Sequence, residues 1–206
     1  LRYAYNTVYK TPLIPSLNIK VSLPVESSKL SINLRTSYAR GYRAPSLKEL
    51  YFEFIDINHF IVGNQELNAE NSNNYHFNIR MKRMGSESVT KLEIGGFYID
   101  IDELISLAQT DTNSAQYSYI NIGRYKTMGL KTKGELSYKH LNLSIGYAHI
   151  GRYNNIDNDN NIAPYNFSPE INTNIRYEIK EINTNINVYY KYTGALNGFA
   201  SNENGD

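Results

Sequence analysis

The sequence has no cysteine, no tryptophan and no long apolar run. Without cysteine there is no disulfide framework, no thiol nucleophile and no thiolate metal site. No apolar stretch approaches the roughly 20 residues that a membrane-spanning helix needs. The 21 basic and 20 acidic residues are dispersed, so no basic surface for nucleic acid is predicted. These absences exclude thiol chemistry, membrane helices and nucleic-acid recognition.

What the sequence does contain is a strict alternation of apolar and polar residues, together with 19 tyrosines. Between residues 16 and 23 every second residue is apolar, from Leu17 to Leu23, which is typical of a strand with one wet face. The alternation recurs in seven further segments. We therefore predict eight strands, the later ones near residues 30–38, 75–82, 91–102, 128–138, 141–147, 167–177 and 186–192.

The fourth of these segments changes phase at two adjacent glycines. Before Gly95 the apolar positions include Ile94, and after Gly96 they begin at Phe97. An extra residue at this pair, a β-bulge, would keep Asp100 and the following Asp102 on the wet face. The sequence therefore predicts a bulge at Gly95 and Gly96.

The connections between the strands alternate between short and long. Short turns are expected near residues 25–28, 85–87, 139–140 and 180–181, and long loops at 40–74, 108–116 and 151–164. All long loops then lie at one end of the sheet, as in outer-membrane barrels. Tyrosines on the apolar face near that end fit an aromatic girdle at the membrane interface: Tyr38, Tyr75, Tyr147, Tyr190 and Tyr192. The alternative is a soluble antiparallel sheet with amphipathic tyrosines at its edges.

The polar face is rich in charged and amide side chains. It includes Lys20, Arg35, Arg80, Lys82, Lys131, Lys133, Glu135 and Arg176. Such a row is costly in a narrow, dry barrel and suits a wide lumen that holds water or a plug. The predicted fold class is all-β: an antiparallel transmembrane β-barrel, of which the chain is a fragment of about eight strands.

The first long loop is the most distinctive segment. Pro45 ends the preceding strand, and Ser46 with Glu49 forms a capping-box pattern. The pattern predicts a helical turn from Leu47 to Tyr51, with Leu47, Leu50 and Tyr51 packed inward.

In this loop the sequence resembles the TonB-dependent outer-membrane receptors. Their barrels carry a Phe-Arg-Ala-Pro-Ser motif followed by Gly-Asn-Pro-x-Leu and a Glu. These correspond to residues 42–46, residues 63–67 and Glu70, with Tyr at the first position and Gln65 in place of Pro. Residues 121–131 are similar to a further family pattern, from which Lys131 departs where the family has Glu.

The resemblance implies the carboxy-terminal part of a larger barrel, of 22 strands in plugged transporters. It covers residues 1–206 as a partial barrel domain, and we expect the plug domain and the last strands to lie outside this chain. It implies a multi-pass barrel in the Gram-negative outer membrane, in contact with its lipid, and energised uptake of a scarce nutrient. Implied partners are the plug domain, TonB, and a chelate such as haem, a ferric siderophore or cobalamin.

The resemblance also supplies candidate ligand-binding residues in the first long loop. They are His59, Tyr42, Arg43, Tyr51 and Asn64. Haem receptors of this family carry a His between the two motifs, and a loop His or a Tyr phenolate can ligate haem iron. The competing interpretation is that the Arg-Ala-Pro and Asn-x-x-Leu motifs are structural and that His59 is an ordinary loop residue.

Other classes of function have weaker support. His149 lies on the apolar face, but no Ser and orienting group can be paired with it, so no catalytic residue is predicted and the protein is not expected to be an enzyme. Asp157, Asp159 and Asn161 resemble the start of a calcium loop, but Ile162 replaces its Gly, so calcium binding is not expected there. We expect no other metal site and no cofactor. A passive porin or adhesin-like barrel is the alternative to energised uptake.

Overall fold

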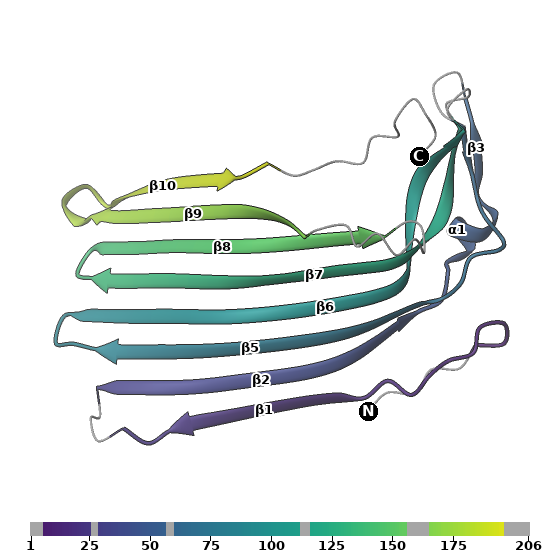
Figure 1. Ribbon diagram of the computed structural model, residues 1–206. Helices are drawn as coiled ribbons and strands as arrows, with labels where there is room; N and C mark the ends of the chain where they lie inside the picture. The colour runs from purple at the N-terminus through teal and green to yellow at the C-terminus, as the bar shows by residue number, and fades with distance from the viewer. Residues whose placement is uncertain (1–5, 26–28, 57–59, 112–115, 156–164, 196–206) are drawn as a thin grey trace.

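A computed structural model describes residues 6–25, 29–56, 60–111, 116–155 and 165–195. Its main sheet is antiparallel, and each strand pairs with its neighbours in the sequence, in the order β1-β2-β5-β6-β7-β8-β9-β10 (Figure 1). This confirms the eight predicted strands and an open, unclosed part of a barrel wall. The strands are β1 Ser16–Leu23, β2 Leu30–Arg43, β5 Glu70–Met84, β6 Ser88–Asp111, β7 Gln116–Tyr138, β8 Leu141–Asn155, β9 Asn166–Ile179 and β10 Thr184–Thr193.

The two faces of the sheet differ in polarity, as the alternation predicts. On one face, exposed apolar residues follow one another across the strands, including Ile19, Phe77, Leu130 and Val188. On the other face, ion pairs link neighbouring strands: Arg80 with Glu93 at 2.8 Å and Lys91 with Glu135 at 2.9 Å. Glu135 also pairs with Lys133 of its own strand at 2.6 Å. Because no second layer among the described residues covers either face, few side chains of the wall are buried.

The predicted bulge at Gly95 and Gly96 is wrong. Both glycines pair in unbroken register with β5 and with β7, and the register shift in this hairpin falls between Gln109 and Asp111. Phe97 consequently lies on the polar face, where the Lys131 Nζ is 4.8 Å from the centroid of its ring. Its ring covers Gly129, because a Cβ there would lie 2.8 Å from Phe97 Cε1.

Without a bulge, the two aspartates lie on the apolar face and not on the wet one. Asp100 is two residues beyond Tyr98, and its carboxylate accepts a 2.7 Å hydrogen bond from Arg124. Tyr98 in turn extends the predicted tyrosine row, with its ring 6.2 Å from that of Tyr75. The apolar band therefore ends at the tyrosines, and polar side chains follow on the same face toward the end of the strands that carries the long loops.

The long connections lie at one end of the strands and the turns at the other (Figure 1). Several strands exceed the predicted lengths, and the largest extensions are in the hairpin where β6 runs to Asp111 and β7 begins at Gln116. Most of the predicted loop at 108–116 is therefore strand, and the β6–β7 hairpin rises above its neighbours. The loop at 40–74 shrinks to 44–69 for the same reason. In the described part of the chain, no helix is long and apolar enough to cross a membrane.

Candidate functional site: the loop assembly between β2 and β5

The described residues of the loop at 44–69 fold into defined structure against the β6–β7 hairpin. It contains the helix α1 Leu47–Tyr51, strand β3 Glu53–Ile55 and strand β4 Phe60–Val62, and the sequence did not predict the two strands. β3 pairs with β4, and β4 pairs in parallel with the start of β7. We call residues 44–69, with the flanking Arg43 and Glu70, the loop assembly.

Arg43 clamps the two ends of the loop assembly together. Its Nε and Nη2 donate to the two carboxylate oxygens of Glu70 at 2.7 and 2.6 Å, and its Nη1 donates to Glu49 at 2.8 Å. Glu70 also accepts a 2.8 Å hydrogen bond from the backbone N–H of Ile105 on β6. Two parallel N–H donors of a guanidinium fit the two oxygens of a carboxylate, and such charge-assisted hydrogen bonds are stronger than neutral ones. One side chain therefore joins β2, α1 and β5.

The predicted capping box at the start of α1 is confirmed. Ser46 Oγ accepts from the backbone N–H of Glu49, whose carboxylate accepts from the N–H of Ser46 at 2.7 Å. Burial acts to raise the pKa of Glu49, but hydrogen bonds from Ser46 and Arg43 outweigh it and lower that pKa below its ordinary value. Glu49 is therefore held ionised as part of the clamp.

Gly63 and Asn64 attach the returning chain to α1. The Gly63 N–H donates to the carbonyl of Phe52 at 2.7 Å, and the Asn64 N–H donates to the carbonyl of Glu49 at 2.8 Å. A Cβ on Gly63 would lie 2.7 Å from backbone atoms of Leu50 and Tyr51, so only glycine fits. The Asn64 side chain donates to the carbonyl of Tyr119 on β7 at 2.9 Å. The Gly-Asn pair thus positions the loop on β7.

A small apolar core lies beneath the assembly. Leu50 of α1, Leu67 and Ile105 of β6 are buried together, and Tyr119 packs against them. Leu67 is 3% exposed, the lowest value among the buried apolar side chains of the described residues. Of the three residues predicted to pack inward from the helix, only Leu50 does so, because a single helical turn directs Leu47 and Tyr51 away from the hairpin.

The outer surface of the assembly is apolar and aromatic. Tyr51 is 61% exposed, and Leu47, Phe52, Phe54 and Ile55 are also exposed. The rings of Phe52 and Phe54 stack at 6.1 Å, and Lys48 Nζ lies 5.2 Å from the centroid of Phe52. We call these six residues the loop patch. In the sequence, the signal for this patch is the run Tyr51 to Ile55, which holds three aromatic residues in five positions.

The candidate binding residues lie in different places. Tyr51 belongs to the loop patch, whereas Arg43 and Asn64 hold the assembly together. Tyr42 pairs with Asn71 and lies on the opposite face of β2 from Arg43. His59 lies outside the described residues, so its role in ligand binding stays a prediction.

No metal-binding cluster is found among the described residues. None of their His, Asp and Glu side chains gather in groups of three or more that would hold a metal ion. The acidic segment at residues 157–161 lies outside the described residues.

A family model described as TonB dependent receptor-like, beta-barrel, matches residues 1–205. The chain belongs to this family. Among solved structures it is similar to the siderophore receptor PirA from Pseudomonas aeruginosa, with a TM-score of 0.56 and 19% sequence identity. The match covers 87% of this chain and 34% of the PirA chain, so this chain spans about a third of that receptor. No curated protein matches the chain.

The TonB-dependent receptors are outer-membrane receptors and transporters and not a family of enzymes. This membership identifies the apolar face of the sheet as the membrane face and the polar face as the lumen face. It also places the loop assembly at the extracellular end, where the long loops lie.

Proposed function

We propose that the chain forms part of the wall and one ligand-binding loop of a receptor for TonB-energised uptake of a scarce nutrient chelate. The observation that supports this most is the loop patch, an exposed aromatic surface on a rigidly clamped loop. Exposed apolar patches of this kind mark binding surfaces. Haem, ferric siderophores and cobalamin all present large rings or faces that such a surface accommodates. PirA is a siderophore receptor, which fits one of these three classes.

Residue roles within this proposal follow from the geometry. Tyr51 and Phe52 contact the ligand, and Lys48 supplies a positive charge beside them. His59, between β3 and β4, is the candidate axial ligand if the cargo is haem. Arg43 and Asn64 position the patch, and Tyr42 supports the base of the loop from the other face. The plug domain, and the segment that contacts the partner protein TonB, would lie in parts of the receptor beyond this chain.

The test is equilibrium binding by the whole receptor in detergent, with haem, a ferric siderophore and cobalamin as separate probes. We expect one probe to bind tightly and Tyr51→Ala and Phe52→Ala to weaken its binding by about tenfold or more, as for aromatic anchors. Tyr190→Ala is the matched control, because Tyr190 is 57% exposed on the wall. Equal affinity in all these variants would exclude the loop patch as the binding surface.

Two further measurements separate the alternatives. Loss of a Soret shift in His59→Ala, with haem as the tight ligand, would identify His59 as an axial ligand. Uptake by whole cells should stop when TonB is removed. Uptake that continues without TonB would instead favour a passive porin.

A further inference from the structure

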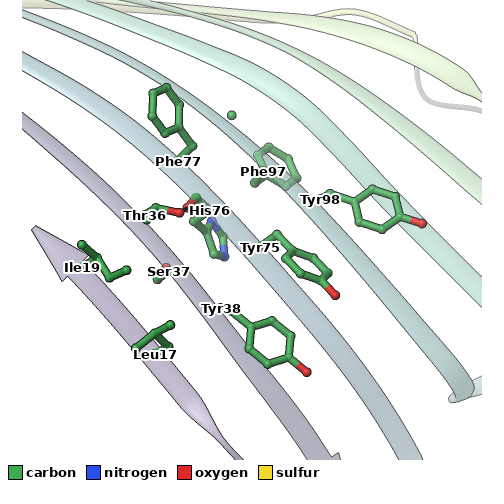
Figure 2. A pocket seen from close by; sticks show the side chains of 11 residues that line it. Leu17, Ile19, Thr36, Ser37, Tyr38, Tyr75, His76, Phe77, Phe97 and Tyr98 are labelled. Atoms are coloured by element: carbon green, nitrogen blue, oxygen red, sulfur yellow. Dashed lines mark hydrogen bonds between the residues drawn. The ribbon is translucent and has the colours of Figure 1, made fainter.

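A groove of about 320 Å³ crosses the membrane face of four strands (Figure 2). Leu17 and Ile19 of β1 form one side, and Phe77 of β5 stands within it. Tyr38, Tyr75 and Tyr98 line its extracellular edge. The four strands are consecutive neighbours in one continuous sheet, with β1 at its edge, so the floor of the groove on β2, β5 and β6 belongs to the wall itself.

The groove exists because two positions on this face carry small residues. Thr36 of β2 and Gly96 of β6 pair with Phe77 from either side. Gly96 is not required by packing: a Cβ there would contact the flexible end of Leu130 at 3.4 Å and a backbone oxygen at 3.7 Å. The missing side chains therefore leave a depression that larger apolar residues would fill without a backbone clash.

The surroundings of the groove change from apolar to polar in the direction of the extracellular end. The rings of Tyr38 and Tyr75 lie 5.1 Å apart, and the Tyr38 hydroxyl donates to Asn73 at 3.0 Å. Arg40 lies two residues beyond Tyr38 on the same face of β2. Its side chain takes part in none of the ion pairs among the described residues, whereas Arg124 is held by Asp100 and Asp102.

We propose that this groove is a specific binding site for a phosphorylated lipid of the outer leaflet. One acyl chain lies over Thr36 and Gly96, the tyrosine row marks the boundary of the hydrocarbon, and Arg40 binds the phosphate. The order of apolar floor, tyrosine hydroxyls and the Arg40 cation matches the order of groups along such a lipid. The proposal rests on the membrane placement that the family implies and is independent of which nutrient is imported.

The test is native mass spectrometry of the whole receptor, delipidated in detergent and titrated with lipid A as the phosphorylated probe. We expect one tightly bound lipid A. Gly96→Leu and Thr36→Ile fill the groove and should each weaken binding about tenfold, and Arg40→Gln should weaken it several-fold. Heat-modifiable migration on gels verifies that each variant barrel is folded.

Matched controls separate this site from general lipid coating of the barrel. Gly134→Leu places the same side chain on the same face in open space, and Lys126→Gln removes a cation that lies instead over Tyr153. Both should bind lipid A like the wild type. Wild-type affinity in Gly96→Leu, equal weakening in Gly134→Leu, or equal binding of uncharged diacylglycerol would overturn the proposal. So would a dimer of the receptor that Gly96→Leu dissociates, because a second barrel would then occupy the groove.

Discussion

The barrel wall and the loop assembly are stabilised in different ways. The wall relies on repeated backbone pairing between long antiparallel strands, and few of its side chains are fully buried. The loop assembly depends on a few specific contacts: the Arg43 clamp, the close fit of Gly63 and the core around Leu67. A repeated structure tolerates the loss of any one side chain, whereas a small assembly does not. Single substitutions within the loop assembly should therefore loosen it and leave the wall intact.

The largest effect is expected for Leu67→Ala. Truncating this buried side chain should lower the free energy of local opening of the loop assembly by roughly 2–5 kcal/mol. Hydrogen exchange of amides 44–69 in the whole receptor measures that free energy. Leu130→Ala, on a wall residue that is 69% exposed, is the control and should leave all protection unchanged. Unchanged protection in Leu67→Ala would contradict the difference between the regions.

Gly63→Ala should have the next largest effect. The added Cβ must displace the backbone of α1, at a cost of roughly 1–3 kcal/mol. Limited proteolysis within residues 44–69 should speed up, while heat-modifiable migration of the barrel stays the same. Gly134→Ala, with no atom within 4 Å of the new Cβ, serves for comparison. A protease-resistant Gly63→Ala loop would show that the turn can relax without loss.

Arg43→Gln should weaken the assembly by about 1–2 kcal/mol, because Glu49 and Glu70 lose their shared donor. The value is modest because the Arg43 side chain is 43% exposed to solvent. Arg43→Lys keeps the charge but not the two-pronged geometry, so its hydrogen exchange should fall between those of Gln and Arg. If the Lys variant matched the wild type, charge alone would account for the clamp.

The smallest effect is a dependence on pH through Glu49. Its pKa in the folded protein is lowered, so its contribution is fully present above the ordinary glutamate pKa of about 4.3 and is lost as pH falls through the lower folded value. Loop protection corrected for intrinsic exchange should be flat from pH 7 to about 5 and fall below about pH 4. Glu49→Gln should remove the part of this change that Glu49 causes. An identical acid loss in the variant would assign the change to other carboxylates.

The same contrast explains what the sequence could predict. Alternation reveals the wall strands and their two faces because every second residue repeats the same signal. The bulge predicted at Gly95 and Gly96 is wrong because the prediction assumes that every polar residue of a strand faces the lumen. Asp100 is polar for another reason: it stands on the membrane face beyond the tyrosine row. Phe97 is tolerated in the lumen because it covers Gly129 beneath Lys131.

The loop assembly was predictable only where its signals are local. Ser46 and Glu49 are three residues apart, and their capping box was predicted correctly. The bond between Arg43 and Glu70 spans 27 residues, and that between Asn64 and Tyr119 spans 55. A single sequence carries no pattern for contacts at such separations. The resemblance to the family motifs singles out Arg43, Gly63, Asn64 and Leu67. The structure supplies the physical reason why the motifs need these residue types: each one holds the loop assembly together.

The most direct test of the central claim, a continuous membrane wall with alternating faces, is single-cysteine scanning of residues 93–99. This chain contributes no cysteine of its own, so each introduced thiol reports one position. Spin labels in the whole receptor in lipid bilayers are compared for collision with oxygen in the lipid and with a nickel chelate in water. A continuous wall with alternating faces predicts oxygen access at 94, 96 and 98 and chelate access at 93, 95, 97 and 99. A label at 97 that collides with oxygen, or a loss of alternation at the glycine pair, would contradict it.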